Sequence, residues 1–264
     1  MTSNGKREKP NDPMKRNYLI IGYGVVGTAV HAAMGHLYVE IHDPDKGYDD
    51  PLRDDYDGVI LCLPTPQGLT GECDDMLVEQ YHQKIRSIMP RVPILIKSTV
   101  SLELIELLQD DYYLTYNPEF LTEDNAFNEF MNQKFAIFGG AECRFWYEVF
   151  KNAGVKMDKV KFTSMKNAAF AKYTINSFLA TKIIFFNELR GLYSSKSFDE
   201  LTELVAMDSR IGESHMMVPG PDMKRGFGGK CLPKDTAAFV TSAKRKGSPL
   251  TLLEKVIEIN KGIR

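Results

Sequence analysis

Cysteine is scarce in this chain: its 264 residues include four, and no two of them form a Cys-x-x-Cys pair. Such scattered cysteines do not make a disulfide framework, and they fit a protein of the reducing cytoplasm. The five histidines show neither His-x-His nor His-x-x-x-His spacing, so we expect no metal site. Long apolar runs are missing too, because none approaches the roughly 20 residues that span a bilayer. We therefore predict no membrane segment.

An excess of charge is also missing. Lys and Arg number 33 against 35 Asp and Glu, which gives a net charge of −2. This balance provides no electrostatic argument for binding nucleic acid or an anionic membrane. With 43% hydrophobic and 26% charged residues, the composition is that of a globular protein of one or two domains. Residues 1–16 are polar and contain two prolines, so we interpret them as a disordered tail.

After the tail comes a strand, a glycine turn and a helix. The apolar run Tyr18–Ile21 leads into Gly-Tyr-Gly-Val-Val-Gly and then into a helical stretch. In this context, GxGxxG is typical of a dinucleotide-binding turn. Gly22 permits the tight turn, Gly24 lets the backbone approach a pyrophosphate, and Gly27 lets helix and strand pack closely. The predicted cofactor contacts of the turn are Gly22, Gly24, Val25, Val26 and Gly27.

A carboxylate follows the second apolar segment. Residues 37–42 read as a strand that ends at Asp43, about 20 residues past the first glycine, as the fingerprint expects. Such a carboxylate accepts hydrogen bonds from a ribose 2′-hydroxyl and repels a 2′-phosphate. The cofactor prediction is therefore NAD rather than NADP, although Lys46 nearby moderates the preference.

The apolar pattern divides the chain in two. Up to about residue 160, short apolar segments without alternation lie between helical stretches, which indicates a parallel sheet covered on both faces. Beyond it the pattern is helical, with a long stretch at 164–193. We predict an α/β fold: a Rossmann-like NAD-binding domain at 17–160, then an all-helical dimerisation domain at 161–264 with a long central helix. Further strands are expected at 58–63, 93–97, 112–116 and 134–138, and further helices at 198–207, 235–245 and from 249 onward.

A single cysteine stands in a glycine-rich loop before a predicted helix. The segment 226–235 reads Gly-Phe-Gly-Gly-Lys-Cys-Leu-Pro-Lys-Asp. Amides at a helix N-terminus stabilise a thiolate, and Lys234 adds positive charge beside it. Cys231 is therefore predicted to be an activated nucleophile. The ordinary alternative, an inert core cysteine, does not account for the glycines, Pro233 and Asp235 around one thiol.

Eight motifs occur in a recognisable order: GYGVVG, CLPTP, KSTV, YNPEFL, FAIFGG, KYTINSFLATKIIFFNEL, RIGESHMMVPG and GFGGKCLPKD. In these motifs the chain resembles the UDP-glucose/GDP-mannose dehydrogenase family from residue 17 to near its end. The resemblance implies oxidation of the C6 alcohol of a nucleotide-linked hexose to the acid. Two NAD are used, the aldehyde is not released, and a thioester forms on Cys231.

The resemblance also implies roles for individual residues. Lys172 and Asn176, four apart on one helix face, hold the oxyanion. Asp235 assists the first proton transfer with a water held by Thr99, and Glu119 directs the hydrolytic water. The other implied contacts are to the cofactor from Pro64, Thr65, Thr99 and Lys234; to the substrate from Glu119, Phe120, Leu121, Lys172, Asn176, Phe227, Gly228 and Gly229; and to a neighbouring subunit's substrate from Arg210, which implies a homodimer.

Structural interpretations of the same residues remain open. Lys172 could extend to solvent from an apolar helix, and Asn176 could be a helix-packing polar residue. Glu119 and Asp235 could each be an acid that complements a helix dipole. Thr65 and Thr99 are also common in turns.

The family normally carries a third domain that binds the nucleotide of the substrate, and this chain ends where the connecting helix is expected to begin. We expect a fragment, a short form or a domain supplied by another chain. The loop 219–225 is longer than in the commonest members, and its Lys224 and Arg225 could contact phosphate.

Three functions stay open at this point. The first is a nucleotide-sugar 6-dehydrogenase acting on UDP-glucose or a related sugar, which makes two NADH per sugar. The second is a single-step 3-hydroxyacid-type dehydrogenase, which makes one NADH and has no use for the thiol. The third is an inactive NAD-binding or dimerisation module. The identity of the sugar and of the nucleotide is left open.

Overall fold

The computed structural model describes residues 16–122, 125–193 and 195–264. The predicted tail lies outside this range except for Arg16, and so do Glu123 and Asp124 after the NPEFL motif. The chain forms two compact units. We call residues 1–64, 76–99 and 108–168 the sheet unit, and residues 65–75, 100–107 and 169–264 the helical unit. The domain boundary expected near residue 160 stays a prediction.

The sheet unit is built on seven strands in the order β2-β1-β3-β4-β5-β7-β9. All neighbouring pairs are parallel except β5 and β7, which run antiparallel. β1, β3, β4 and β5 are buried along their whole length, as expected for strands covered on both faces. The strands are β1 (Asn17–Ile21), β2 (Tyr38–His42), β3 (Gly58–Leu61), β4 (Ile94–Ile96), β5 (Leu114–Tyr116), β7 (Ala136–Gly140) and β9 (Val160–Thr163), and a small parallel pair is made of β6 (Asn132–Gln133) and β8 (Lys156–Met157).

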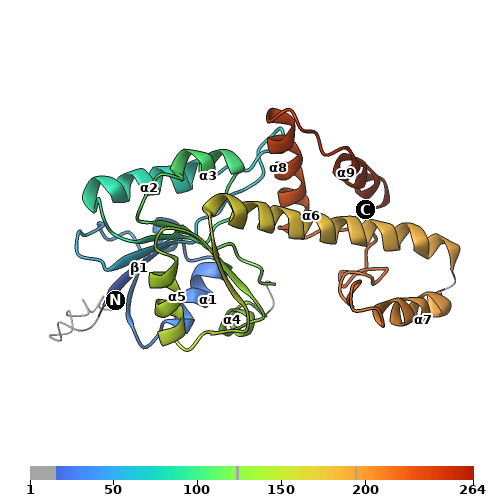
Figure 1. The fold of residues 1–264 in the computed structure, drawn as a ribbon, viewed down its shortest axis with the longest axis horizontal. Helices are drawn as coiled ribbons and strands as arrows, with labels where there is room; N and C mark the ends of the chain where they lie inside the picture. The colour runs from blue at the N-terminus through green and yellow to red at the C-terminus, as the bar shows by residue number, and fades with distance from the viewer. Residues whose placement is uncertain (1–15, 123–124, 194) are drawn as a thin grey trace. The chain divides into compact units, whose positions relative to one another are not determined.

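Helices cover both faces of this sheet, with α1, α4 and α5 on one face and α2 on the other (Figure 1). On the first face Trp146, Val149 and Phe150 of α5 recur at helical spacing and are almost fully buried. They pack into one cluster with side chains of α1, α4 and the strands. Each fully buried aromatic side chain contributes about 1.5–3 kcal/mol. The helices of this unit are α1 (Val25–Ala33), α2 (Met76–Ile88), α4 (Ala126–Met131) and α5 (Cys143–Asn152), with a 3₁₀ turn at Pro44–Lys46.

The direction of β7 differs from an all-parallel sheet. Its last two residues, Gly139 and Gly140, pair with β5. A Cβ at Gly139 would lie 2.6 Å from the carbonyl oxygen of Ser164, and one at Gly140 would overlap that of Leu114. Gly140 therefore permits the close approach of β5 at this antiparallel join, and Gly139 permits that of the segment after β9. Hydrophobic pattern does not encode strand direction, which is why the sequence did not reveal it.

The helical unit is organised on the long helix α6 (Met165–Leu189), which is followed by a 3₁₀ turn at Arg190–Leu192. The predicted stretch 164–193 thus contains one helix of 25 residues. One buried cluster joins α6 to the two helices that end the chain, through residues Ala180, Ile184, Phe227, Val240, Leu253 and Val256. The other helices are α3 (Leu102–Leu108, whose last residue groups with the sheet unit), α7 (Ser195–Ala206), α8 (Leu232–Arg245) and α9 (Thr251–Ile263).

Candidate active site

The glycine turn of the sheet unit has a restricted geometry. Gly22 adopts a φ of +92°, and a Cβ there would lie 2.5 Å from the carbonyl oxygen of Cys62. A Cβ at Gly27 would overlap the carbonyl oxygen of Gly22. At Gly24, by contrast, a Cβ would meet nothing within 4 Å, and this residue is the N-cap of α1 without a side-chain cap. The turn is therefore closed on the protein side and open at the helix N-terminus, where anions bind.

The predicted acid is anchored at this turn. Asp43 follows β2, and its Oδ2 accepts a hydrogen bond from the Tyr23 amide at 2.7 Å. Lys46 donates to the Tyr23 carbonyl and lies over the Tyr23 ring. The carboxylate therefore lies next to the glycine turn, as a ribose-binding acid requires. Val25 and Val26 begin α1, and Pro64 is exposed three residues after β3.

A buried ion pair lies at the carboxyl ends of two neighbouring strands in the sheet unit. Lys97 follows β4, and its Nζ lies 2.6 Å from Glu119 Oε2 and 2.9 Å from Asn117 Oδ1. The ammonium also lies over the ring of Phe130 at 5.1 Å. Glu119 Oε1 accepts the amide of Phe120 at 2.7 Å. Both oxygens of the predicted water-directing carboxylate are therefore engaged by the protein, and Lys97 is the residue that sequence reasoning missed.

A second constellation lies in the helical unit, around the carboxylate of Asp235. Asn176 Nδ2 donates to Asp235 Oδ2 at 2.6 Å, and Lys172 Nζ lies 4.0 Å from the same oxygen. Lys234 Nζ lies 2.9 Å from Oδ1. Lys172, Asn176 and Asp235 are all buried, with 1% of Asp235 exposed. The structure thus brings together four of the predicted residues from α6 and α8, and Lys172 does not extend into solvent.

The thiol of Cys231 stands one helical turn before this carboxylate. Cys231 is the N-cap of α8, and its carbonyl oxygen accepts the Asp235 amide at 2.8 Å. It is exposed, whereas Cys62, Cys73 and Cys143 are buried. Burial raises the pKa of Cys62 to about 12 and that of Cys73 to about 11, and it also raises the pKa of Cys143. Those three thiols are therefore held protonated, and Cys231 is the accessible one.

The remaining predicted residues have varied surroundings. Arg210 is exposed, and its guanidinium is paired with Asp208 two residues away. The segment that carries it is anchored from α6, because Lys182 Nζ donates to the carbonyl oxygens of Ile211 and Gly212. Burial lowers the pKa of that ammonium. The others divide by exposure into buried Thr65 and Phe227, half-buried Thr99, Phe120, Leu121 and Gly228, and exposed Gly229.

In the described part of the chain, no three His, Cys, Asp or Glu side chains are grouped to hold a metal ion. Among the same residues, no helix combines the length and apolar character needed to cross a membrane.

Two family models match the chain. Residues 51–151 match the NAD binding domain of the UDP-glucose/GDP-mannose dehydrogenase family, and residues 166–262 match its central domain. The chain belongs to the UDP-glucose/GDP-mannose dehydrogenase family. The resemblance found in the motifs and the α/β fold class are both confirmed. The NAD-binding match also confirms the choice of cofactor class, although the glycine turn lies before the matched residues.

Curated relatives of this family match over most of the chain. UDP-glucose 6-dehydrogenase TuaD of Bacillus subtilis is 31% identical over 217 residues, which cover 77% of this chain and 46% of the relative. UDP-glucose 6-dehydrogenase AglM of Haloferax volcanii is 27% identical over 301 residues, which cover 92% of this chain and 69% of the relative. The chain spans about half the length of TuaD and of several other relatives that it matches.

Solved structures share the fold. A UDP-glucose dehydrogenase from Pyrobaculum islandicum superposes with a TM-score of 0.76 at 22% identity, covering 97% of this chain and 70% of its own. A 3-hydroxyisobutyrate dehydrogenase from Mycobacterium tuberculosis gives a TM-score of 0.72 at 18% identity and covers 94% of both chains. At such low identities the likeness shows the fold alone.

Proposed function

We propose that the chain carries the cofactor-binding and catalytic parts of an NAD-dependent nucleotide-sugar 6-dehydrogenase. The reaction is oxidation of the C6 alcohol of a UDP-glucose-type sugar to the uronic acid through a thioester. The observation that carries the proposal is the group of Lys172, Asn176 and Asp235, one helical turn from the exposed Cys231. Several curated relatives named as UDP-glucose 6-dehydrogenases support this choice of substrate.

The glycine turn fits NAD. The open space at Gly24 and the uncapped amides of α1 suit a pyrophosphate, and the Asp43 carboxylate suits a ribose 2′-hydroxyl. When bound, NAD accepts a hydride from the substrate carbon, and two equivalents are required to take an alcohol to an acid. The chain contributes binding and orientation to this chemistry.

The thiol of Cys231 takes the covalent step. Its sulfur attacks the aldehyde carbon, a C–S bond forms, and negative charge develops on oxygen. Lys172 and Asn176 of α6 supply fixed N–H donors for that oxyanion. Departure of the second hydride to the cofactor leaves a thioester. Addition of water and cleavage of the C–S bond then release the acid and restore the thiol.

Three other residues take supporting roles in the proposal. The buried carboxylate of Asp235, in the helical unit, exchanges the proton of the first oxidation, and Thr99, in the sheet unit, holds a water. Glu119, whose charge is balanced by Lys97, directs the water of hydrolysis. Arg210, which is exposed, contacts the substrate of a second subunit.

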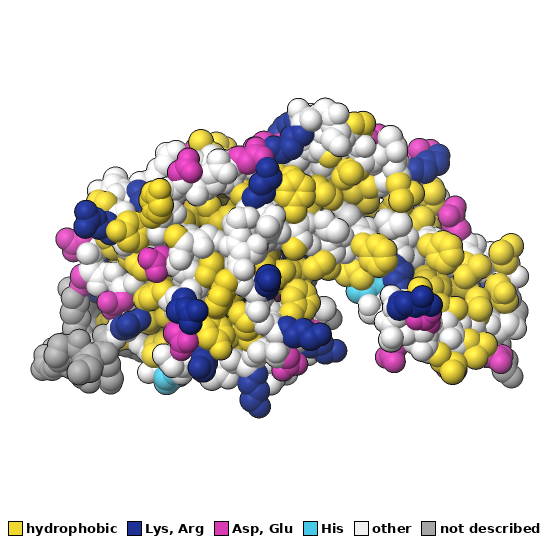
Figure 2. All heavy atoms as spheres, in the orientation of Figure 1, with side chains coloured by type: hydrophobic (Ala, Val, Ile, Leu, Met, Phe, Trp, Pro, Cys, Tyr) yellow, Lys and Arg dark blue, Asp and Glu magenta, His cyan; other side chains and the backbone are white. Residues whose placement is uncertain are grey.

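We further propose a cytoplasmic homodimer formed through the helical unit. Phe178 and Phe185 of α6 are 66% and 59% exposed, and Met207 beyond α7 is 80% exposed. Figure 2 shows hydrophobic side chains at the surface over α6 and α7. Exposed apolar patches of this kind mark association surfaces. All four cysteines are free, which suits a reducing compartment.

The runner-up is a single-step 3-hydroxyacid dehydrogenase. It is favoured by the fold shared with the Mycobacterium tuberculosis enzyme, which matches this chain over 94% of both lengths. That reaction transfers one hydride and leaves Cys231 without a role. The number of NADH formed per substrate therefore separates the two functions.

The test is an NADH assay of the purified protein with UDP-sugars, GDP-sugars, free sugars and 3-hydroxy acids. We expect two NADH per UDP-sugar consumed and loss of acid formation in Cys231→Ser. A matched control is Cys143→Ser, because that buried thiol donates to the Gly140 carbonyl and a hydroxyl can replace it. One NADH per 3-hydroxy acid, unaffected by Cys231→Ser, would establish the runner-up. NAD binding without turnover of any substrate would indicate an inactive module.

A further inference from the structure

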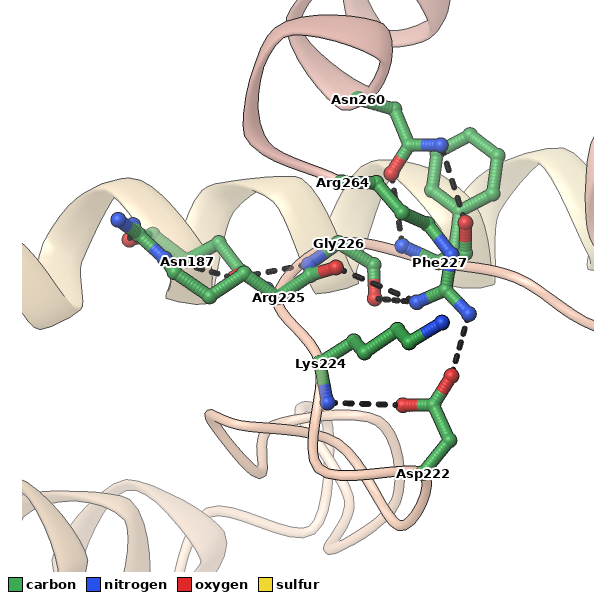
Figure 3. A network of polar contacts seen from close by, with 8 residues as sticks. All are labelled: Asn187, Asp222, Lys224, Arg225, Gly226, Phe227, Asn260 and Arg264. Carbon is green, nitrogen blue, oxygen red and sulfur yellow. Dashed lines mark hydrogen bonds and ion pairs between the residues drawn. The ribbon is translucent and has the colours of Figure 1, made fainter.

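The segment that leads into the thiol loop is held by side chains of two helices in the helical unit (Figure 3). From α6, Asn187 Oδ1 accepts the amide of Gly226 at 3.0 Å. From α9, Asn260 Oδ1 accepts the amide of Phe227 at 2.7 Å, and its Nδ2 donates to the carbonyl of the same residue at 3.0 Å. Arg264, just after α9, donates to the Arg225 carbonyl at 3.2 Å.

Two glycines of the loop lie against the side chains of Asn260 and Arg264. Gly226 is buried with a φ of +70°, and a Cβ there would overlap Asn260 Oδ1. A Cβ at Gly228 would overlap the guanidinium of Arg264. The glycine-rich sequence before the thiol is therefore shaped by close approach of α9 as well as by backbone conformation.

The contacts of Asn187, Asn260 and Arg264 with residues 225–227 form a clamp, which lies close to the thiol along the chain. Phe227 is 3% exposed and belongs to the buried cluster of α6, α8 and α9. Four residues later Cys231 caps α8. The thiol therefore stands on a short tether between a fixed point at Phe227 and a helix that begins at Leu232. Any shift of the fixed point changes the direction in which the sulfur is presented.

Arg264 adds a second attachment. Its guanidinium pairs with Asp222, whose Oδ1 accepts the amide of Lys224 at 3.1 Å. Arg225 donates to the main-chain carbonyl of Asn187. The segment 222–227 is thus held by Arg264 at Asp222, by α6 at Arg225 and Gly226, and by α9 at Phe227. Arg225, which the sequence suggested as a phosphate ligand, is committed to this clamp.

We propose that Asn260 and Arg264 are positioning residues, which hold the backbone of 225–227 so that Cys231 is presented at the start of α8. Their effect on turnover rests on the proposed function, whereas their effect on thiol presentation does not. The central contact is made by the side-chain amide of Asn260, which hydrogen-bonds both the N–H and the carbonyl of Phe227. No other side chain of this size offers both a donor and an acceptor.

The decisive variant is Asn260→Asp. It keeps the size of the side chain and the acceptor for the Phe227 amide, but it places a carboxylate oxygen against the Phe227 carbonyl. The matched control is Lys261→Gln, one residue along α9 and exposed. Arg264→Gln is the second variant and lies at the end of the helix, where loss of folding is not expected.

Two readouts are taken on the full chain. The first is the rate of iodoacetamide alkylation at Cys231 without substrate, mapped by peptide mass spectrometry, which the three buried cysteines do not obscure. The second is kcat and KM in the NADH assay. We expect the alkylation rate of Cys231 to change by about threefold or more in Asn260→Asp, because the backbone that leads to the thiol is displaced. We expect kcat to fall by about tenfold or more with the KM for NAD unchanged.

Arg264→Gln should shift both readouts in the same direction by a smaller factor, and Lys261→Gln should shift neither. Folding of each variant is checked by far-UV circular dichroism. Wild-type alkylation and wild-type kcat in folded Asn260→Asp overturn the proposal, and if that variant does not fold, the same result in Arg264→Gln overturns it. If alkylation responds but the parent chain oxidises no sugar, the positioning role stands and the proposed function fails.

Discussion

Removing the charge of Lys97 should destabilise the sheet unit strongly. Its ammonium is buried against Glu119 Oε2 at 2.6 Å, and the two side chains are 1% and 12% exposed. Lys97→Met keeps most of the aliphatic length but leaves the carboxylate without a counter-charge. Removing one partner of a buried pair costs about 3–5 kcal/mol. Because Glu119 keeps the Phe120 amide, we expect the lower end, about 3 kcal/mol.

The sheet unit has a built-in probe for this measurement. Trp146 is the single tryptophan of the chain and is fully buried there, so its fluorescence reports the unfolding of that unit. A loss of about 3 kcal/mol corresponds to a fall in Tm of roughly 6–12 °C for a unit of this size. Urea unfolding followed by the same signal gives the free energy directly.

The double variant Lys97→Met/Glu119→Gln decides between charge and packing. If the two charges stabilise each other, the double variant should regain about 2 kcal/mol of unfolding free energy relative to Lys97→Met alone. Additive effects of the two single changes, within about 0.5 kcal/mol, would refute the reasoning and assign the loss to the contact of Lys97 with Phe130. Glu119→Gln alone is the necessary third corner of this cycle.

Three further outcomes are expected. Gly24→Ala should weaken NAD binding measured by calorimetry and leave the Tm of the Trp146 transition unchanged. Gly27→Ala should weaken NAD binding and also lower that Tm, because only its Cβ meets backbone. Equal effects of the two changes on Tm would contradict this. Asp43→Ser should weaken NAD and improve NADP binding, and an unchanged ratio of the two affinities would contradict the ribose contact. Burial alone raises the pKa of Asp111, but hydrogen bonds from Arg86, the Tyr113 amide and His82 outweigh it and hold that pKa below its ordinary value. The stability that this carboxylate contributes is present above a pH of about 4 and is lost as the pH falls through the folded-state pKa. The free energy of unfolding that Asp111→Asn loses in urea should therefore shrink below about pH 4. A loss that stays constant with pH would contradict the reasoning.

Much of the sheet unit could be predicted because its signals are local. The strands β1, β3 and β4 are short apolar runs, and their cores fall within the predicted segments. The predicted segments extend beyond the strands by one to two residues at several ends, as at 58–63 for Gly58–Leu61, since apolar side chains continue after the ladder stops. The glycine turn could also be predicted, because Gly22 and Gly27 lie against nearby backbone where no Cβ fits.

Contacts between distant segments could not be predicted in this way. The sequence around Lys97 does not show that Glu119, 22 residues later, will neutralise it. Lysine and glutamate are usually exposed, so their burial here could not be predicted from residue type. Likewise, Asn260 and Asn187 are ordinary polar residues of amphipathic helices by sequence. Their part in holding Gly226 and Phe227 depends on the packing of α6 and α9.

The two buried charge groups suggest a division of labour within the chain. In the helical unit the carboxylate of Asp235 is approached by Lys172, Lys234 and Asn176. Positive charge and N–H groups gathered in this way suit a developing oxyanion on a substrate. In the sheet unit the pairing of Lys97 with Glu119 is one to one and is completed by Asn117. The first group therefore suits contact with a substrate oxygen, and the second stabilises the sheet unit. We therefore expect Asp235→Asn to lower turnover strongly and to leave the Trp146 transition, which reports the sheet unit, unchanged.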